Sequence, residues 1–161
     1  MFLRCRGEGM KQYEKIIFVG ESGTNRSAMA EAIFKEYRLK RPMEVACRAL
    51  VALFPEPINQ KVEAVLISNG INVENHMSVQ LGAEDFTENT LVLVMEETQR
   101  DKILEEYPQA DPENVQVLTT FVGDELEIID PYGGPLQSYG VCYETLNKSI
   151  KKLVDKLNEG E

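Results

Sequence analysis

An arginine and a run of small polar residues follow an apolar stretch near the start of the chain. Residues 16–19 (Ile-Ile-Phe-Val) are apolar and too few for a helix, which is typical of a buried strand. Residues 20–26 are small or polar, and apolar residues recur at helical spacing after them. A strand, a tight loop and a helix N-terminus in succession gather backbone N–H groups around one point. The segment therefore predicts an anion-binding loop, in which Arg26 offers a guanidinium fork to a phosphate.

A second motif with chemical content is Asp130-Pro131-Tyr132, which two glycines follow. Taken alone, these residues are typical of a turn. A catalytic role for Asp130 is therefore a hypothesis that needs support from the rest of the chain.

The order of residues around the loop resembles the signature of the low-molecular-weight protein tyrosine phosphatases. That signature is a strand ending in Val-Cys, five loop residues, and then Arg-Ser-Pro-Met-Ala-Glu-Ala-Ile-Phe. This chain has Val19-Gly20, five loop residues, and then Arg-Ser-Ala-Met-Ala-Glu-Ala-Ile-Phe over residues 26–34. The resemblance covers almost the whole chain from Lys15 onward. It implies a three-layer α/β/α fold with a four-stranded parallel sheet.

The resemblance also implies roles for individual residues. The phosphate-binding loop would consist of Glu21, Ser22, Gly23, Thr24, Asn25, Arg26 and Ser27, and Arg26 would also clamp the transition state. Asp130 would take the place of the general acid, and Tyr132 would form a wall of the slot for an aryl phosphate. The nucleophilic Cys of the family would stand at residue 20, where this chain has Gly. Ser27, which supports the thiolate in the family, is expected here to cap the helix.

Gly20 has no side chain that could attack phosphorus. Loss of a covalent nucleophile elsewhere costs on the order of 10⁴ to 10⁶ in rate. We therefore expect a pseudophosphatase that binds phosphate or phosphotyrosine and whose turnover is absent or strongly impaired. Other loop residues also differ from the family: Asn25 replaces a common Cys, Ala28 a Pro and Gly23 an Asn. Glu21 adds a carboxylate whose repulsion of a nearby anion is about 2 to 4 kcal/mol at an effective dielectric near 20.

Two alternatives remain open at this stage. The first is a phosphohydrolase in which Ser22, Thr24 or a water attacks and Asp130 serves as acid, although no base is evident next to either hydroxyl. The second is an interaction module in which the loop only supports the fold, Glu21 excludes phosphate and the surface binds a partner protein. Substitution of Arg26 separates the three readings: the pseudophosphatase would lose anion binding, the phosphohydrolase would lose its slow turnover, and the interaction module would be unaffected.

Length and composition limit the possible partners. The 161 residues fit one domain, which we place at residues 11–161 after a flexible N-terminal extension at residues 1–10. The formal net charge of −10 argues against nucleic acid and anionic membranes. Three scattered cysteines predict no disulfide framework, no metal site and a cytoplasmic location. The expected partners are phosphate, phosphotyrosine or another oxyanion, together with a phosphoprotein, and no cofactor is expected.

Strand and helix patterns alternate along the chain, which favours an α/β fold with a central parallel sheet. The expected strands are residues 16–19, 44–51, 91–95 and 115–118. The expected helices are residues 27–39, a helix opened by Pro57 and ended by Gly70, a short turn within 79–86, residues 97–107, and a final helix from Pro135 with Leu136 on its inner stripe. The first strand should be central, since ligands of such sheets bind where the strand order reverses. The single histidine, His76, is expected to be structural.

Overall fold

The computed structural model describes residues 11–159 of the chain, so the predicted extension at residues 1–10 lies outside the described residues. The described part contains one four-stranded parallel sheet in the order β2-β1-β3-β4. Its strands are β1 (Lys15–Gly20), β2 (Glu44–Ala49), β3 (Thr90–Val94) and β4 (Val115–Val117). The expected parallel sheet with β1 between two neighbours is therefore confirmed.

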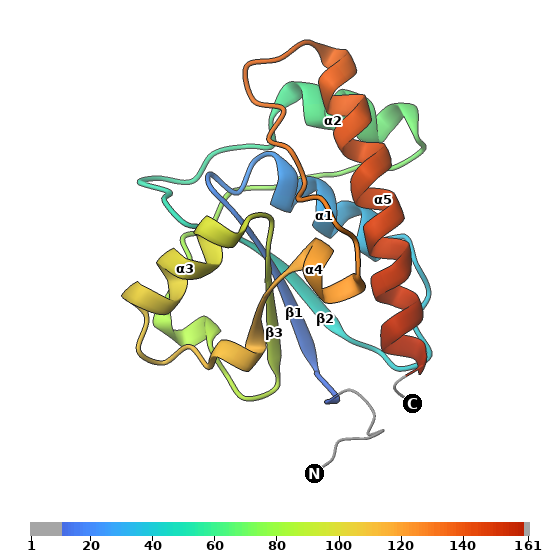
Figure 1. Cartoon of the computed structure of the whole chain (residues 1–161). Helices are drawn as coiled ribbons and strands as arrows, with labels where there is room; N and C mark the ends of the chain where they lie inside the picture. The colour runs from blue at the N-terminus through green and yellow to red at the C-terminus, as the bar shows by residue number, and fades with distance from the viewer. Residues whose placement is uncertain (1–10, 160–161) are drawn as a thin grey trace.

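Helices cover both faces of this sheet. They are α1 (Arg26–Lys35), α2 (Gln60–Ser68), α3 (Glu97–Glu106), α4 (Leu118–Val122) and α5 (Leu136–Glu159), with 3-10 turns η1 (Ala83–Asp85) and η2 (Pro112–Asn114). Figure 1 shows α1 and α5 on one side of the sheet and α3 on the other. None of the helices within residues 11–159 is both long and apolar enough to cross a membrane.

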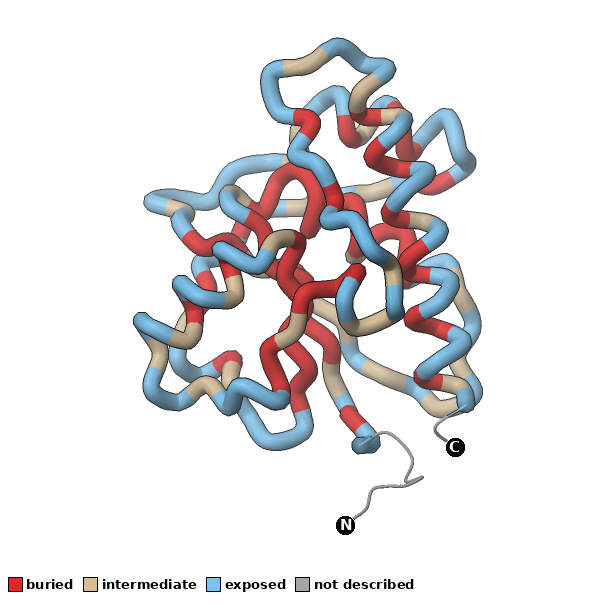
Figure 2. The backbone as a smooth tube through the Cα atoms, viewed as in Figure 1, coloured by how far each residue is buried: buried red, intermediate tan, exposed pale blue. Residues whose placement is uncertain are grey.

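The side chains of β1 join two hydrophobic cores. Ile16 and Phe18 pack into the core below α1 and α5, whereas Ile17 and Val19 pack into the core that contains Ile103 of α3. Because β1 has a neighbour on each side and a helical layer on each face, every residue from 16 to 19 is buried. Figure 2 shows this buried backbone running through the middle of the molecule. The apolar stretch thus fixes the strand that leads into the loop.

Several predicted boundaries were wrong, and in the helices local hydrogen bonds set the observed ends. The first helix ends at Lys35 rather than residue 39, since the N–H groups of Glu36 and Tyr37 bond to carbonyls only three residues back. The second strand ends at Ala49 rather than 51. Pro57 does not open α2. Instead, the side chain of Asn59 caps that helix by accepting from two of its N–H groups.

Three other elements differ from expectation. The helical turn within 79–86 is reduced to η1, and β4 ends one residue early. The helix α4 follows β4 directly, in a segment rich in β-branched residues for which no helix is expected, and Gly123 ends it with a left-handed φ of +87°. Leu136 is half exposed and so does not belong to the inner stripe of α5, although Tyr139, Leu146 and Ile150 do.

We expect Phe18→Ala to lower the free energy of unfolding by about 3 to 5 kcal/mol. The Phe18 ring is fully buried and meets the Phe34 ring edge to face, with centroids 5.8 Å apart, so its loss leaves a cavity in the core. Urea denaturation measures the effect. The control Leu53→Ala removes a side chain that is 89% exposed and should change stability by less than about 0.5 kcal/mol. Equal losses for the two variants would contradict this account.

Candidate functional site

The predicted loop lies at the carboxyl end of β1, between that strand and the first turn of α1. The chain leaves β1 for β2 on one side and later returns to β3 on the other, so this strand end is the point where the strand order reverses. Gly23 has a left-handed φ of +73°, and a Cβ there would lie 3.1 Å from the Ala49 Cβ. Glycine is thus the residue that this turn of the loop accommodates.

Four backbone N–H groups of the loop are without a partner. Within residues 11–159, the N–H groups of Glu21, Ser22, Gly23 and Asn25 donate to no protein acceptor. These residues line a small hollow of about 10 Å³, together with Gly20, Arg26, Ser27 and Asp130. That volume is about the minimum that holds one water molecule. Unpaired donors at a helix N-terminus form a site for an anion.

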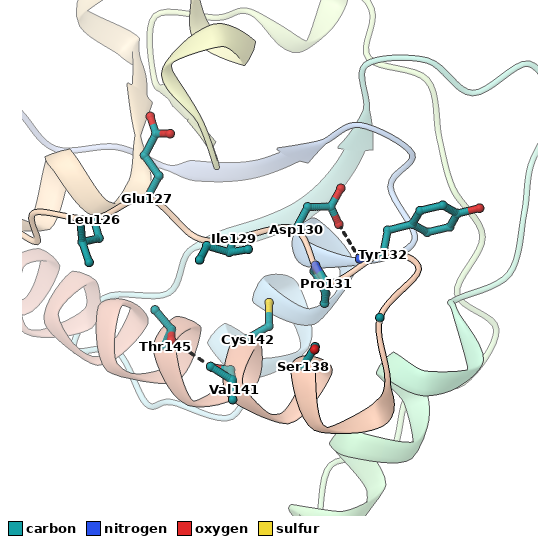
Figure 3. Close-up of a pocket in the computed structure, with 11 residues that line it drawn as sticks. Leu126, Glu127, Ile129, Asp130, Pro131, Tyr132, Ser138, Val141, Cys142 and Thr145 are labelled. Atoms are coloured by element: carbon teal, nitrogen blue, oxygen red, sulfur yellow. Dashed lines mark hydrogen bonds between the residues drawn. The ribbon is translucent and has the colours of Figure 1, made fainter.

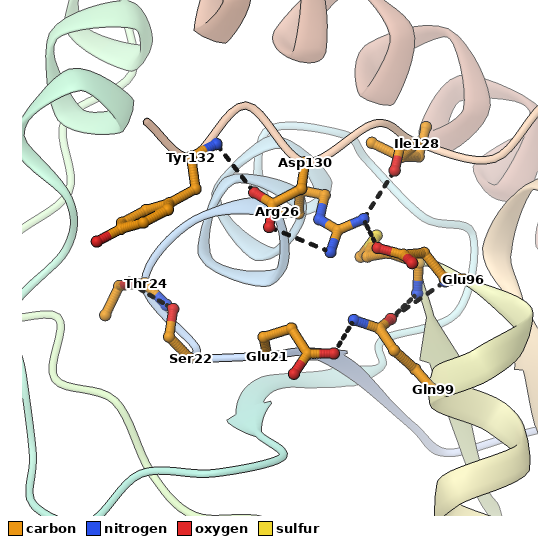
Figure 4. Close-up of polar contacts among 10 residues, drawn as sticks. Glu21, Ser22, Thr24, Arg26, Glu96, Gln99, Ile128, Asp130 and Tyr132 are labelled. Carbon is orange, nitrogen blue, oxygen red and sulfur yellow. Dashed lines mark hydrogen bonds and ion pairs between the residues drawn. The ribbon is translucent and has the colours of Figure 1, made fainter. Parts of the chain in front are cut away.

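Arg26 lies beside this hollow with only 3% of its side chain exposed. Its Nη1 donates to the carbonyl oxygen of Ile128 at 2.7 Å and lies 2.7 Å from Oε2 of Glu96. Its Nη2 lies 3.8 Å from Oδ2 of Asp130. Figure 4 shows the guanidinium surrounded by these groups. Two carboxylates therefore compensate the buried positive charge.

Asp130 lines the hollow, and Tyr132 lies two residues further along the same turn. Oδ1 of Asp130 accepts from the Tyr132 N–H at 3.0 Å, so this carboxylate orders its own turn as well as facing Arg26. The Tyr132 ring is 74% exposed. Figure 4 places it on the same side of the view as Ser22 and Thr24, opposite Glu96. The two motifs of the sequence thus lie beside each other in space.

Glu96 and Gln99 are site residues that the sequence analysis missed. Gln99 is 1% exposed, and its Oε1 accepts from the N–H groups of Met95 and Glu96 at 2.9 and 3.1 Å. Its Nε2 donates to Oε2 of Glu21 at 3.1 Å. This hydrogen bond holds the Glu21 carboxylate against α3. A signal existed: these residues follow β3, whose carboxyl end lies at the same sheet edge as that of β1.

The space next to Gly20 is filled by a serine hydroxyl. A Cβ at residue 20 would lie 2.9 Å from Oγ of Ser27, so a side chain there would require this hydroxyl to rotate. The Cys47 thiol donates to the same oxygen at 3.2 Å. The expectation that Ser27 caps α1 was wrong, because Asn25 is the N-cap residue and its side chain makes no capping bond.

Cys47 and Cys142 are the cysteines within the described residues, and both are buried. Burial raises the pKa of Cys47 to about 12, although its hydrogen bond with Ser27 opposes this shift. Burial also raises the pKa of Cys142 to about 12, although Arg26 opposes the shift. Since the thiolate is the attacking species, the raised pKa values disfavour either thiol as a nucleophile.

The loop hydroxyls and the histidine support the backbone. Ser22 Oγ and Thr24 Oγ1 lie 2.7 Å apart and share a hydrogen bond, and in the described chain neither has a histidine or carboxylate partner.

His76 Nε2 lies 2.8 Å from the carbonyl oxygen of Gly23, and its Nδ1 lies 3.9 Å from Oε1 of Glu31. The imidazole therefore contacts the backbone of the loop, as a structural role for His76 would require.

Comparison with known proteins identifies the class to which this fold and site belong. The family model for low molecular weight phosphotyrosine protein phosphatase matches residues 15–161, so the chain belongs to this family. A protein-arginine-phosphatase of Geobacillus stearothermophilus is 31% identical over 143 residues, which are 89% of this chain and 95% of that protein. The low molecular weight protein-tyrosine-phosphatase PtpB of Staphylococcus epidermidis is 33% identical over 89% of this chain and 96% of its own length.

Solved structures agree with this assignment. The YwlE arginine phosphatase from Geobacillus stearothermophilus superimposes with a TM-score of 0.84 at 32% identity, covering 91% of this chain and 94% of that one. The low molecular weight protein tyrosine phosphatase from T. tengcongensis gives a TM-score of 0.82, also at 32% identity, and covers 89% of this chain and 99% of its own. The predicted three-layer fold is therefore confirmed.

We expect Cys47 and Cys142 to react slowly with iodoacetamide in the folded protein. With the pKa raised to about 12, only about 10⁻⁴ of each thiol is ionised near pH 8, compared with about a quarter at the ordinary pKa of about 8.5. Mass spectrometry of each cysteine peptide gives the rate, and the urea-unfolded chain is the reference. A folded-state rate for Cys47 equal to the unfolded rate would restore it as a candidate nucleophile.

Proposed function

We propose that this chain binds a phosphoryl group in the loop of residues 20–27 and that it hydrolyses phosphate esters far more slowly than a cysteine-dependent phosphatase. One observation carries the proposal: four unpaired backbone N–H groups and a buried guanidinium border the same hollow. In this arrangement the N–H groups and Arg26 would hold the phosphoryl oxygens. Asp130 would face the leaving-group oxygen as a proton donor.

The chemistry that remains is positioning without covalent attack. In the family mechanism a thiolate displaces the leaving group and water then releases phosphate, so that one difficult step is divided into two. At residue 20 of this chain no atom is available for the first step. Ser22 and Thr24 hydrogen-bond to each other rather than to a base, which disfavours the alternative of a hydroxyl nucleophile. Anion binding is therefore the activity that the site supports best.

Glu96 competes with the ligand for Arg26. Its carboxylate lies 2.7 Å from Nη1, where a phosphoryl oxygen would otherwise accept a hydrogen bond. A phosphate that enters must displace this carboxylate or lie next to it, and either event costs free energy. Glu21 interferes less, because Gln99 holds its carboxylate and water surrounds the rest of it. The interaction module in which Glu21 excludes phosphate is accordingly the weaker reading.

Phosphoarginine is a second candidate ligand beside phosphotyrosine. Three carboxylates, those of Glu21, Glu96 and Asp130, surround the hollow or its edge. Within residues 11–159, Oδ1 of Asn25 is the single buried side-chain polar atom without a hydrogen-bond partner. These oxygen atoms can accept hydrogen bonds from a ligand whose phosphoryl group is attached to a guanidino group, because that group carries N–H donors and an aryl ester does not. The name of the Geobacillus relative, a protein-arginine-phosphatase, agrees with this choice.

We expect Arg26→Met and Glu96→Gln to change phosphate affinity in opposite directions. Loss of Arg26 removes charge-assisted hydrogen bonds of about 1.5 to 3 kcal/mol each, so binding should weaken at least about tenfold. Glu96→Gln removes the competing charge, so binding should tighten about tenfold. Calorimetric titration with inorganic phosphate, phosphotyrosine and phosphoarginine measures both effects.

Arg38→Met and Glu97→Gln are matched controls. Both side chains are exposed and lie outside the hollow, so these variants should bind phosphate as the parent does. If the parent bound none of the three ligands, or if Arg26→Met bound as tightly as the parent, the interaction-module reading would replace the proposal.

We expect Gly20→Cys to hydrolyse p-nitrophenyl phosphate on the order of 10⁴ times faster than the parent or more. The thiol would stand at the end of β1, where the family places its nucleophile, once the Ser27 hydroxyl rotates away. Gly20→Ala is the control, because it adds the same Cβ without a thiol and should remain as slow as the parent. Parent turnover that matches the Cys variant would instead support a nucleophile other than cysteine.

A further inference from the structure

A groove of about 440 Å³ lies between the segment of residues 126–132 and α5. This strap groove, as we call it, has Leu126, Ile129 and Pro131 on one wall and Val141 and Thr145 on the other. Figure 3 shows Leu126 and Ile129 directed toward α5, while Asp130 and Glu127 point to the other side of the segment. Glu127, Asp130 and Tyr132 also line the groove, so Asp130 borders both the groove and the hollow that contains Arg26.

Large apolar side chains lie uncovered in the strap groove. Leu126 is 80% exposed, Ile129 is 83% exposed and Val141 is 65% exposed. Single exposed apolar residues are common on protein surfaces, but several that line one groove are typical of an interaction site. Ile128, which lies between Leu126 and Ile129 in the sequence, is buried in the core. Its burial anchors the segment that exposes these two side chains.

The charge around the strap groove restricts its occupant. Glu125, Glu127 and Asp130 are exposed on the same segment, and the whole chain carries a net charge of −10. A partner with apolar and basic residues would cover the walls and complement these carboxylates. A second copy of this chain would bring the same acidic segment against itself, since a two-fold contact pairs identical patches. Charge thus favours a different protein over self-association.

We propose that the strap groove binds a peptide segment, rich in apolar and basic residues, of the protein that carries the phosphoryl group. The proposal rests on the proposed function for its link to the phosphoryl group. The physical connection is short: the carbonyl of Ile128 and the carboxylate of Asp130 contact Arg26 from the same segment whose other side forms the groove wall. A docked segment would hold its protein beside the hollow and restrain Asp130.

The test is fluorescence anisotropy with a labelled, unphosphorylated short peptide in which Leu and Ile alternate with Lys and Arg. The parent should bind this peptide, and the double variant Leu126→Ser with Ile129→Ser should weaken binding at least about tenfold. Leu53→Ser is the matched control, since Leu53 is 89% exposed and lies outside the groove. It should bind as the parent does. Glu125→Gln should weaken binding and reduce its salt dependence.

Several outcomes would overturn the inference. One is that the parent does not bind the peptide, and another is that the double variant binds it as tightly as the parent. A third is that the parent binds equally well a peptide with Ser in place of Leu and Ile, or one with Glu in place of Lys and Arg. Sedimentation that showed a dimer lost in the double variant would assign the groove to a second copy. Phosphate titration of the double variant separates the two proposals, because phosphate binding retained without peptide binding rejects only the strap groove.

Discussion

A buried guanidinium has to be neutralised, and this requirement organises the site. Arg26 sits at the start of α1 with almost no contact with water, so its charge must find acceptors inside the protein. It finds them on two other segments: Glu96 follows β3, while Ile128 and Asp130 come from the stretch before α5. Segments that are far apart in the sequence are thereby held at one carboxyl end of the sheet. The charge that we propose binds a phosphoryl group is also the charge that brings these segments together.

The surrounding contacts hold the loop from several directions. His76 contacts the Gly23 carbonyl, Gln99 joins Glu21 to the start of α3, and the Ser27 hydroxyl lies where a side chain at residue 20 would begin. These contacts leave the N–H groups of the loop without protein acceptors. The loop is therefore held by contacts from several elements while its N–H groups remain free to donate, as the proposed anion binding requires.

Local sequence predicted those parts of the fold and site that depend on neighbouring residues. The apolar run before Gly20, the polar loop and the motif at Asp130 could be recognised because each occupies a few consecutive positions. The contact of Glu96 with Arg26 could not, because it depends on strand order over a long separation in sequence. The helix α4 was missed because packing overrides the β-propensity of its residues. Helix ends were misplaced because local hydrogen bonds decide them, such as the Asn59 cap of α2 and the three-residue bonds that end α1.

The high pKa values of Cys47 and Cys142 have a consequence for oxidative conditions. Phosphatases that rely on a reactive thiolate lose activity when peroxide converts that sulfur to a sulfenic acid, because susceptibility follows thiolate character and exposure. In the described part of this chain both thiols are buried with raised pKa values, and no cysteine lines the hollow beside Arg26. A site built from N–H groups and a guanidinium has nothing for peroxide to oxidise. If the proposed ligand binds there, peroxide should leave its binding unchanged.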